Sequence, residues 1–404
     1  MIKKNHDKLQ FKTLDNIDLN GKFVLVRVDI NSPIDPYTEK IMNEFRIKAI
    51  LDTLKELANS KTVLLAHQSR PGSKDFISLS SHTDLLKKHI NNKVTFIPDI
   101  IGPVAINAIK NLNDGEILVL DNIRFLSEET NKKFAAEDTI MVKKLSNLFD
   151  VYVNDAFASV HRNHTSLIGF PKKIPSCIGR LVEREIISIK KILAKGSNKQ
   201  IFVMGGAKPD DRIQVMDYVL NNKKTESRFL LGGVLAKVFL KARNQKLSTI
   251  ITNELEEYQD IIPLAKKLIS KHNKKIILPL DYAYEENGER IERKIDAIQQ
   301  THNIFDVGDK TIGLFKQNIE DADVIVTNGP LGLMENPLFV KGTKEILGFI
   351  SKNKSFNVAG GGHMTTMVEK EGLIDKFDHV STGGGALLHM LSGKIPDPLK
   401  MLKI

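Results

Sequence analysis

The amino-terminal half of the chain alternates short apolar runs with segments of helical periodicity. The apolar runs lie at Phe23–Val28, Thr62–Ala66, Val94–Ile97, Glu116–Leu120 and Val151–Val153. The helical patterns between them include Arg46–Leu57, His82–Ile90 and Glu137–Leu148. Runs of Val, Ile and Leu that are separated by helices predict a parallel sheet that is buried on both faces.

Polar side chains follow four of these predicted strands at the point where each strand ends. They belong to the segments Asp29–Asn31, His67–Arg70, Asp121–Arg124 and Asn154–Asp155. The carboxyl ends of parallel strands meet at one edge of a sheet, and ligands bind at that edge. A single Arg is more often part of a surface salt bridge, but four strand ends together predict one binding site.

The loop after the last of these strands is dense in cationic side chains. His161, Arg162 and His164 lie close together, with no Cys or third His nearby in the chain. One interpretation is zinc binding by the His pair, which has suitable spacing but too few ligands. The other is recognition of phosphate or carboxylate, which Arg162 can bind through two parallel hydrogen bonds. We favour the anion.

In the carboxyl-terminal half, the predicted strands run into turns that are rich in glycine. These turns include Gly205–Arg212, Gly232–Gly233, Asn328–Gly332, Gly360–His363 and Gly383–Gly385, and a further strand ends at Asp281. Glycine after a strand lets backbone N–H groups approach phosphate and opens a helix whose N-terminus favours anions. One such pair can be a simple tight turn, but several at one sheet edge predict a nucleotide site.

Between the two halves the sequence predicts an amphipathic helix at Leu181–Leu193. Val182, Ile186, Ile189 and Leu193 recur in steps of four, three and four, so they form one apolar stripe. Six of the 26 glycines precede this helix and twenty follow it. An ordinary surface helix would show the same stripe. The change in chemistry across it favours a bridge between an anion-binding half and a nucleotide-binding half.

Length and composition limit the class of protein. A chain of 404 residues is long enough for two domains. The single cysteine, Cys177, rules out an intramolecular disulfide and fits a reducing cytoplasm. No apolar run approaches the roughly 20 residues of a membrane helix, and the first residues lack the apolar core of a signal peptide. We therefore expect neither membrane insertion nor export.

The formal net charge of +10 would suit nucleic-acid binding, but its distribution does not. The lysines are scattered, and basic stretches interleaved with aromatic residues are missing. A basic surface also attracts anionic metabolites, which is the interpretation we favour. The chain contains no GxxxxGK[ST], no GxSxG and no GxGxxG after the first strand of either half. A P-loop enzyme, a serine hydrolase with a nucleophile elbow and a dinucleotide dehydrogenase are therefore disfavoured.

Taken together, the motifs resemble those of the phosphoglycerate kinase family over nearly the whole chain. In chain order they are RVDINSP (Arg27–Pro33), HQSRPG (His67–Gly72), LDNIRF (Leu120–Phe125), VNDAFASVHRNHTS (Val153–Ser166), GGAKPDDRI (Gly205–Ile213), VTNGPLGLMENP (Val326–Pro337), AGGGH (Ala359–His363) and STGGGA (Ser381–Ala386). Each motif is modestly specific, but their common order and spacing leave little room for another family. HQSRPG and GGGH look closer to the archaeal branch.

The resemblance implies an α/β fold of two Rossmann-like domains, each a parallel sheet flanked by helices, around a hinged cleft. Residues 1–180 would bind glycerate, 181–195 would form the interdomain helix, 196–390 would bind nucleotide, and 391–404 would return to the first domain. The implied reaction is reversible phosphoryl transfer between 1,3-bisphosphoglycerate and MgADP, giving 3-phosphoglycerate and MgATP in glycolysis and gluconeogenesis. The enzyme would be a cytoplasmic monomer that binds these small molecules and neither nucleic acid nor membrane.

The same resemblance implies roles for individual residues. The glycerate would be bound by Asp29, Asn31, Arg46, His67, Arg70, Arg124 and Arg162. The first two would take its hydroxyl and carboxyl end, and the last four the phosphate that is not transferred. The nucleotide would be bound by Gly206, Lys208, Arg212, Gly232, Gly233, Asn328, Pro330, Gly332, Glu335, Gly360, Gly361, Gly362 and His363, with Glu335 at the ribose. Arg46 and Lys208 would be catalytic, because a carboxylate nucleophile needs charge neutralisation and no general base.

Three positions depart from the family pattern. Arg212 stands where Lys is usual and keeps the charge, and His389 stands where an acidic residue is common. His363 replaces the aspartate that usually helps to hold magnesium. Imidazole is a poor ligand for Mg²⁺, which prefers oxygen. We therefore expect no side-chain metal ligand, Mg²⁺ bound mainly through the nucleotide phosphates, and His363 in contact with phosphate or water.

Two other classes stay open from the residues alone. A non-catalytic two-domain protein that closes on an anion would share the hinge and the strand-end site, but it would not need Lys208 or a nucleotide pocket. A dehydrogenase is the enzymatic alternative, and the missing fingerprint weakens it.

Overall fold

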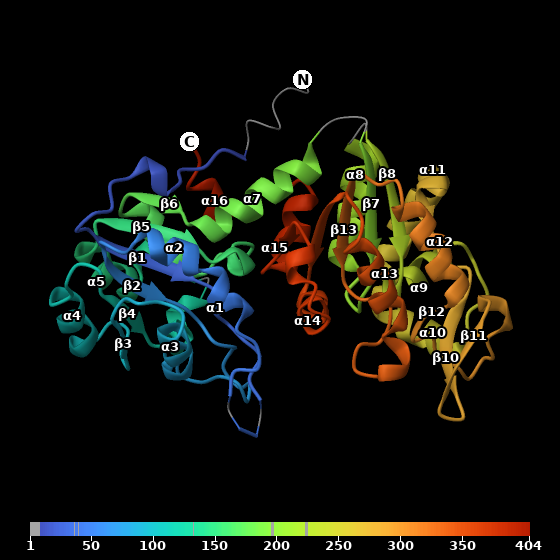
Figure 1. The fold of residues 1–404 in the computed structure, drawn as a ribbon, viewed down its shortest axis with the longest axis horizontal. Helices are drawn as coiled ribbons and strands as arrows, with labels where there is room; N and C mark the ends of the chain where they lie inside the picture. Colours follow the sequence, from blue (N-terminus) through green and yellow to red (C-terminus); the bar gives the residue numbers. More distant parts are fainter. Residues whose placement is uncertain (1–8, 36, 39, 132, 195–197, 223–224) are drawn as a thin grey trace. The chain divides into compact units, whose positions relative to one another are not determined.

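The computed structural model describes residues 9–35, 37–38, 40–131, 133–194, 198–222 and 225–404, which fall into two compact units (Figure 1). Unit 1 comprises the described residues up to Ile187 together with Ile395–Ile404. Unit 2 comprises the described residues of Ser188–Lys394. The boundary between the units falls inside helix α7 (Arg180–Leu193). The helix itself agrees with the one predicted at Leu181–Leu193.

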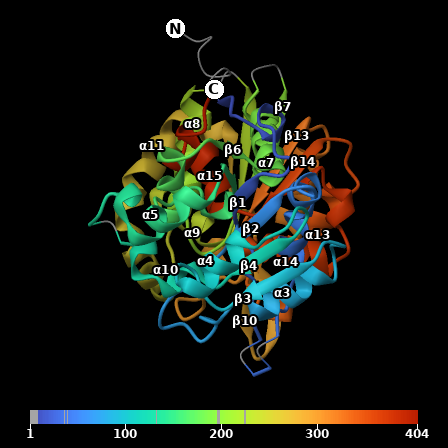
Figure 2. The same ribbon diagram turned by 90° about the vertical axis from the view of Figure 1, so that its left-hand side faces the viewer.

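Unit 1 is built on a six-stranded sheet with the order β3-β4-β2-β1-β5-β6 (Figure 2). The strands are β1 (Phe23–Val28), β2 (Lys61–Leu65), β3 (Val94–Ile97), β4 (Ile117–Leu120), β5 (Val151–Asp155) and β6 (Ser176–Ile178). Every neighbouring pair is parallel, which confirms the predicted parallel sheet. β5 extends beyond the predicted run, so Asn154 and Asp155 are the last residues of the strand itself.

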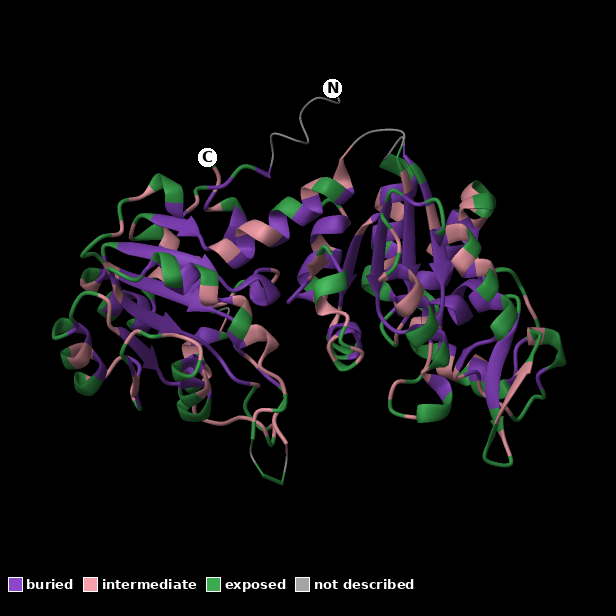
Figure 3. Cartoon of the chain, in the orientation of Figure 1, coloured by how far each residue is buried: buried purple, intermediate pink, exposed green. Residues whose placement is uncertain are grey.

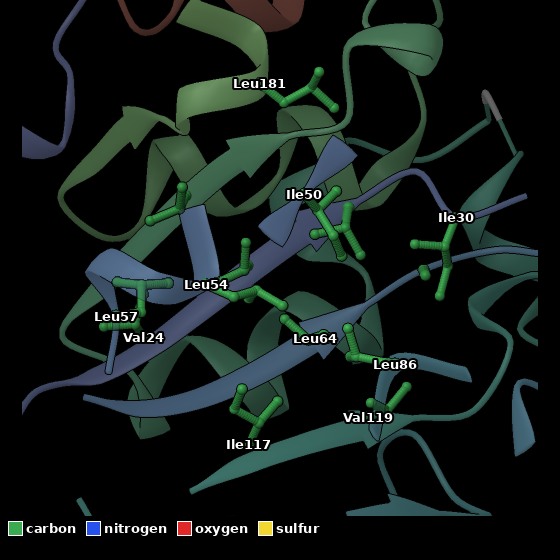
Figure 4. Packing of buried hydrophobic residues seen from close by; sticks show 14 of the residues in the cluster. Val24, Ile30, Ile50, Leu54, Leu57, Leu64, Leu86, Ile117, Val119 and Leu181 are labelled. Atoms are coloured by element: carbon green, nitrogen blue, oxygen red, sulfur yellow. The ribbon is translucent and has the colours of Figure 1, made fainter. Parts of the chain in front are cut away.

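Both faces of this sheet are covered. Val24 of β1 belongs to the apolar cluster on one face, with Leu54 and Leu64 (Figure 4). Its neighbour Leu25 belongs to the cluster on the other face, with Ile109. The inner strands β1, β2, β4 and β5 are therefore almost entirely buried (Figure 3), which explains their continuous apolar sequence. The helices of unit 1 are α1 (Phe45–Ala49), α2 (Leu51–Glu56), α3 (Ser80–Lys87), α4 (Pro103–Lys110), α5 (Ile140–Leu145), α6 (Thr165–Ile168) and α16 (Asp397–Lys400).

Two of the predicted helices are shorter or more divided than their patterns suggested. The pattern Arg46–Leu57 forms two helices, α1 and α2, that meet at Ile50. In Glu137–Leu148 the α-helix starts only at Ile140, because Thr139 is its N-cap and accepts the N–H of Val142. Apolar periodicity indicates which side chains are buried, but it does not predict where a helix is interrupted or capped.

Unit 2 contains a second six-stranded sheet, with the order β15-β14-β13-β7-β8-β9. Its strands are β7 (Lys199–Met204), β8 (Glu226–Leu231), β9 (Ile276–Ile277), β13 (Val324–Asn328), β14 (Phe356–Gly360) and β15 (His379–Val380), all parallel. The helices are α8 (Asp210–Asn222), α9 (Gly233–Ala242), α10 (Thr249–Glu254), α11 (Ile262–His272), α12 (Asp309–Ile319), α13 (Lys341–Ile350), α14 (Gly362–Lys370) and α15 (Gly384–Leu391). The α/β class with two parallel sheets is thus confirmed.

A small antiparallel sheet in unit 2 was not predicted. It consists of β10 (Tyr282–Glu286), β11 (Glu289–Arg293) and β12 (Asp306–Val307). Asn287 and Gly288 join β10 to β11, and both have positive φ, as the tightest hairpin turns require. An Asn-Gly pair between two short strands is typical of such a hairpin.

The end of the chain packs within unit 1. Lys12 donates its backbone N–H to the carbonyl oxygen of Leu402 at 2.9 Å, and Asn163 Nδ2 donates to Asp397 Oδ2 at 2.9 Å. The residues Ile395–Ile404 therefore join a unit whose strands all come from the first half of the chain. Among the described residues, no helix combines the length and apolar character that crossing a membrane requires.

Candidate active site

Arg46 joins the two predicted substrate residues at the end of β1. Its Nη1 lies 2.9 Å from Asp29 Oδ1 and 2.9 Å from the carbonyl oxygen of Asn31. Ser159 Oγ donates to the other carboxylate oxygen of Asp29 at 2.7 Å. Burial opposes ionisation of Asp29, but Arg46 and the Ser159 hydroxyl bring its pKa below the ordinary value. Asp29 is therefore an ionised anchor that orients Arg46.

His67 lies just after β2, and its imidazole is buried. Its Nδ1 is 3.2 Å from Nη2 of Arg27, a residue of β1. Burial lowers the pKa of His67 well below its ordinary value, and the charges of Arg27 and Arg124 lower it further. His67 is therefore neutral, so it can donate or accept a hydrogen bond but adds no charge to the site.

Arg162 lies close enough to Arg124 for its charge to disfavour the charged form of Arg124. Burial, followed by the charge of Arg162, lowers the pKa of Arg124 to about 10. Burial also lowers the pKa of Arg162, and Arg46 and Arg70 add to this effect. The Nε of Arg124 is buried and has no hydrogen-bond partner among the described residues. Mutually repelling cations with an unpaired N–H form a site that an anion would complete.

The buried pair Arg27 and Glu129 was missing from the sequence-based set. The Arg27 side chain is fully buried, its Nε donates to Ser166 Oγ at 2.8 Å, and its Nη2 lies 3.7 Å from Glu129 Oε1. Glu129 accepts the backbone N–H of Ser166 at 2.9 Å. A charged residue inside the apolar run Phe23–Val28 was a signal that a partner must exist, because an unpaired buried charge is costly. Nothing in the chain pattern identified Glu129 as that partner.

The structure gives no support to zinc binding at His161 and His164. Among the described residues, no group of three His, Cys, Asp or Glu side chains lies close enough to hold a metal ion. His164 Nδ1 instead lies 3.7 Å from Glu129 Oε1, and burial together with Arg27 lowers its pKa to about 3. His164 is therefore neutral and lies near Glu129 and the arginines, and its Nδ1 has no hydrogen-bond partner among the described residues.

In unit 2 the glycine turns pack directly on one another. Gly206 donates its N–H to the carbonyl oxygen of Pro330 at 2.6 Å, and Gly233 donates to that of Leu331 at 3.1 Å. A Cβ on Gly233 would lie 2.6 Å from Gly206 N, and a Cβ on Gly232 would lie 2.5 Å from the Leu331 side chain. Glycine is required at these positions by the close packing of three turns, with or without a ligand.

The turn after β14 is different, because the space beside it is open. Gly361 has a φ of +101°, and a Cβ on Gly362 would meet nothing within 4 Å. The exposed residues Gly362 and His363 begin α14. Asn328, at the end of the neighbouring β13, is buried, and its Nδ2 has no hydrogen-bond partner among the described residues. An open helix N-terminus beside an unpaired amide N–H is suited to a phosphate group.

The two cationic residues predicted for the nucleotide site have different surroundings. Arg212 bridges two turns, because its Nε donates to the carbonyl oxygen of Asn328 at 3.2 Å and its Nη1 to that of Lys208. Burial lowers the pKa of Arg212 to about 10. Lys208 is exposed in the turn between β7 and α8. The Arg212 side chain thus links the two turns through hydrogen bonds, whereas the Lys208 side chain is exposed to solvent.

Glu335 and Gly332 belong to the long turn after β13. Gly332 approaches the chain at Phe339, since a Cβ there would lie 2.2 Å from the carbonyl oxygen of that residue. Glu335 Oε1 lies 3.9 Å from His363 Nδ1, with both side chains largely exposed. A carboxylate therefore stands near the start of α14, although position 363 itself carries an imidazole.

Comparison with known proteins places the chain in one family. A family model described as phosphoglycerate kinase matches residues 14–394. The chain is 42% identical to a phosphoglycerate kinase of Methanococcus maripaludis, across 97% of this chain and 98% of that protein. It is 41% identical to a phosphoglycerate kinase of Methanothermus fervidus, across 98% and 97%.

Solved structures agree with this result. The crystal structure of phosphoglycerate kinase from Pyrococcus horikoshii superimposes with a TM-score of 0.89 at 34% identity, covering 97% of this chain and 98% of that one. The structure of phosphoglycerate kinase from Coxiella burnetii has a TM-score of 0.78 at 28% identity and the same coverage. On these matches, the chain belongs to the phosphoglycerate kinase family, a family of phosphotransferases.

Proposed function

We propose that this chain catalyses reversible phosphoryl transfer between 1,3-bisphosphoglycerate and MgADP, giving 3-phosphoglycerate and MgATP. The observation that carries the proposal is the cluster of His67, Arg124 and Arg162 at the strand ends of unit 1. Burial lowers the pKa of both arginines, the charge of Arg162 lowers that of Arg124 further, and the Arg124 Nε has no hydrogen-bond partner among the described residues. A doubly charged phosphate supplies the negative charge and the acceptors that this cluster lacks.

The glycerate end of the substrate is assigned to Asp29 and Asn31, and the nucleotide to the turns of unit 2. The phosphates would lie at the N-terminus of α14, where Asn328 Nδ2 and the open backbone provide donors. These donors suit phosphate oxygens and do not suit a cation. Mg²⁺ would accordingly be carried by the phosphates, whose charge it neutralises.

Arg46 and Lys208 are assigned to charge neutralisation on the transferred group. Arg46 is held by Asp29, so its position is set before the substrate arrives. Lys208 is exposed and can follow the phosphoryl group as it moves. Because one residue belongs to unit 1 and the other to unit 2, we propose that transfer requires closure about α7. Closure would also exclude water from the acyl phosphate.

The decisive experiment is a coupled assay of ADP formation from ATP that depends on 3-phosphoglycerate. A phosphotransferase forms ADP only when both substrates and Mg²⁺ are present. A non-catalytic anion-binding protein would bind 3-phosphoglycerate without forming ADP, and a dehydrogenase would instead change the absorbance of a nicotinamide cofactor. Size-exclusion chromatography with light scattering tests the associated expectation of a monomer, and cell fractionation tests the expected cytoplasmic location.

A further inference from the structure

Arg27 occupies a position in β1 where the pattern of the strand favours an apolar residue. Side chains two positions apart in a strand share a face, and Leu25 belongs to the apolar cluster on this face of the unit 1 sheet. The Arg27 side chain is fully buried there. Taking a guanidinium out of water is costly, and a well-packed apolar residue is often at least as stabilising. None of the roles assigned above uses this buried charge.

Sheet register places Arg27 next to His67. Arg27 of β1 is paired with Leu65 of β2, and His67 follows Leu65 by two residues. Across this pair of strands, Nη2 of Arg27 lies 3.2 Å from Nδ1 of His67. The guanidinium therefore contacts the ring nitrogen of a residue that is proposed to bind the substrate phosphate.

The other hydrogen bonds of Arg27 hold its guanidinium in this orientation. Nη1 donates to the carbonyl oxygen of Val28, and Nε donates to Ser166 Oγ at 2.8 Å. The Ser166 hydroxyl in turn donates to Glu129 Oε1 at 2.8 Å, and that oxygen lies 3.7 Å from Arg27 Nη2. Glu129 is itself fully buried. The guanidinium can turn away from His67 only if these contacts break.

The contact with Arg27 determines which ring nitrogen of His67 carries the hydrogen. A guanidinium has N–H donors and no acceptor, so Nδ1 of His67 accepts. The imidazole is neutral, since burial lowers its pKa and outweighs the opposing charge of Asp29. The other charges that face it lower the pKa further; they are Arg27, Arg124 and Arg162. A neutral imidazole has one N–H, which must then be at Nε2.

Resting on the proposed function, we infer that Arg27 is a positioning residue of the glycerate site and holds His67 as a neutral Nε2–H donor to the substrate phosphate. Among the described residues, His67 has no hydrogen-bond partner besides Arg27, which leaves Nε2–H for a ligand. The opposite tautomer would present a lone pair to an anion. An imidazolium would add another positive charge beside the arginines. The tautomer set by Arg27 avoids both.

The first test determines the tautomer directly in the full chain. Nitrogen-15 NMR of histidine-labelled protein distinguishes a protonated ring nitrogen from an unprotonated one. The chain has 11 histidines, and the signals of His67 are those that disappear in His67→Ala. We expect Nδ1 to be unprotonated and Nε2 protonated at about pH 7, with or without 3-phosphoglycerate. In Arg27→Met/Glu129→Gln, which removes both buried charges together, signals of the other tautomer should appear.

The second test measures substrate affinity in the same double variant. A hydrogen bond to a charged group contributes about tenfold or more to affinity, so KM for 3-phosphoglycerate should rise by about tenfold. KM for ATP should stay within about twofold, because unit 2 is unchanged. In a His67→Ala background the same two changes should raise KM by less than about twofold more, since the donor that Arg27 orients is already absent. Arg228→Met, which removes an arginine from β8 of unit 2, is the control and should leave KM for 3-phosphoglycerate unchanged.

A wild-type spectrum with the hydrogen on Nδ1 of His67 overturns the inference. It is also overturned if a folded Arg27→Met/Glu129→Gln protein keeps its KM for 3-phosphoglycerate, or if the rise is equally large in the His67→Ala background. If the double variant does not fold, the wild-type spectrum decides. Absence of ADP formation from ATP and 3-phosphoglycerate would instead contradict the proposed function. The spectrum does not depend on activity, so the two failures are distinct.

Discussion

Asp155 Oδ1 accepts the backbone N–H of Val182 at 3.2 Å, which ties the end of β5 to the first turn of α7. The carboxylate is buried, and its Oδ2 has no hydrogen-bond partner among the described residues. A Cβ on Gly179 would lie 2.4 Å from the Asp155 carboxyl carbon, so glycine is needed for this approach. The first turn of α7, the helix that contains the boundary between the units, is thus held by the buried carboxylate of Asp155.

This contact predicts a pH-dependent stability. Burial raises the pKa of Asp155 from 3.8 to about 6, so the folded protein holds this proton more tightly than the unfolded chain. Its stabilising contribution is complete below pH 3.8 and is lost as the pH rises through about 6. The loss is on the order of 3 kcal/mol. Asp155→Asn should flatten the change in thermal unfolding midpoint between pH 4 and 6, whereas exposed Asp84→Asn should not. An unaltered pH profile in Asp155→Asn would refute the assignment.

Arg46→Ala should reduce turnover far more than substrate affinity. Its guanidinium is held by Asp29 before substrate binds, so its main contribution is expected in the transition state. Loss of one such donor costs about 10²–10³ in kcat. Steady-state kinetics with 3-phosphoglycerate and ATP measures this, with Lys48→Ala on the same helix as the control. A rise in KM with unchanged kcat would mean that Arg46 only binds.

Arg162→Ala should have the opposite signature. Arg162 is assigned to the phosphate that is not transferred, and nearby positive charges already disfavour its charged form in the absence of an anion. Its removal should therefore weaken anion binding, whereas Arg46 and Lys208, the residues proposed for the transferred group, are unchanged. We expect KM for 3-phosphoglycerate to rise by about tenfold, the value of one charged hydrogen bond, with little change in kcat. Calorimetric titration with 3-phosphoglycerate provides the direct measurement. Unchanged affinity would remove the loop at His161–His164 from the site.

Substitutions at His363 test the absence of a metal-ligating side chain. His363→Ala should weaken nucleotide affinity only modestly, because the backbone at the start of α14 remains available to phosphate. His363→Asp should leave activity intact or lower the Mg²⁺ concentration needed for half-maximal rate, since an oxygen ligand suits this cation. Magnesium titrations of the initial rate compare the variants. A nucleotide-bound structure with the imidazole coordinated to the metal would contradict the expectation.

The sequence alone was sufficient for the architecture and for much of the candidate site. A run such as Phe23–Val28 is apolar throughout because a central parallel strand is buried on both faces, and this cause is local. Polar residues after such runs must then share one edge. This reasoning predicted that Asp29, His67 and Arg124 lie near one another, and in the structure the charges of these residues affect one another's pKa.

Other features depend on which distant segments meet, and only the tertiary structure decided them. Glu129 is the buried partner of Arg27, and Asn303 of Lys237, although each pair is far apart in the chain. Gly233 is glycine because Gly206 lies against it. Periodicity records whether a side chain is buried, since burial follows from the local pattern. Periodicity does not identify the residue that a buried side chain contacts, because that residue is set by the packing of the whole unit.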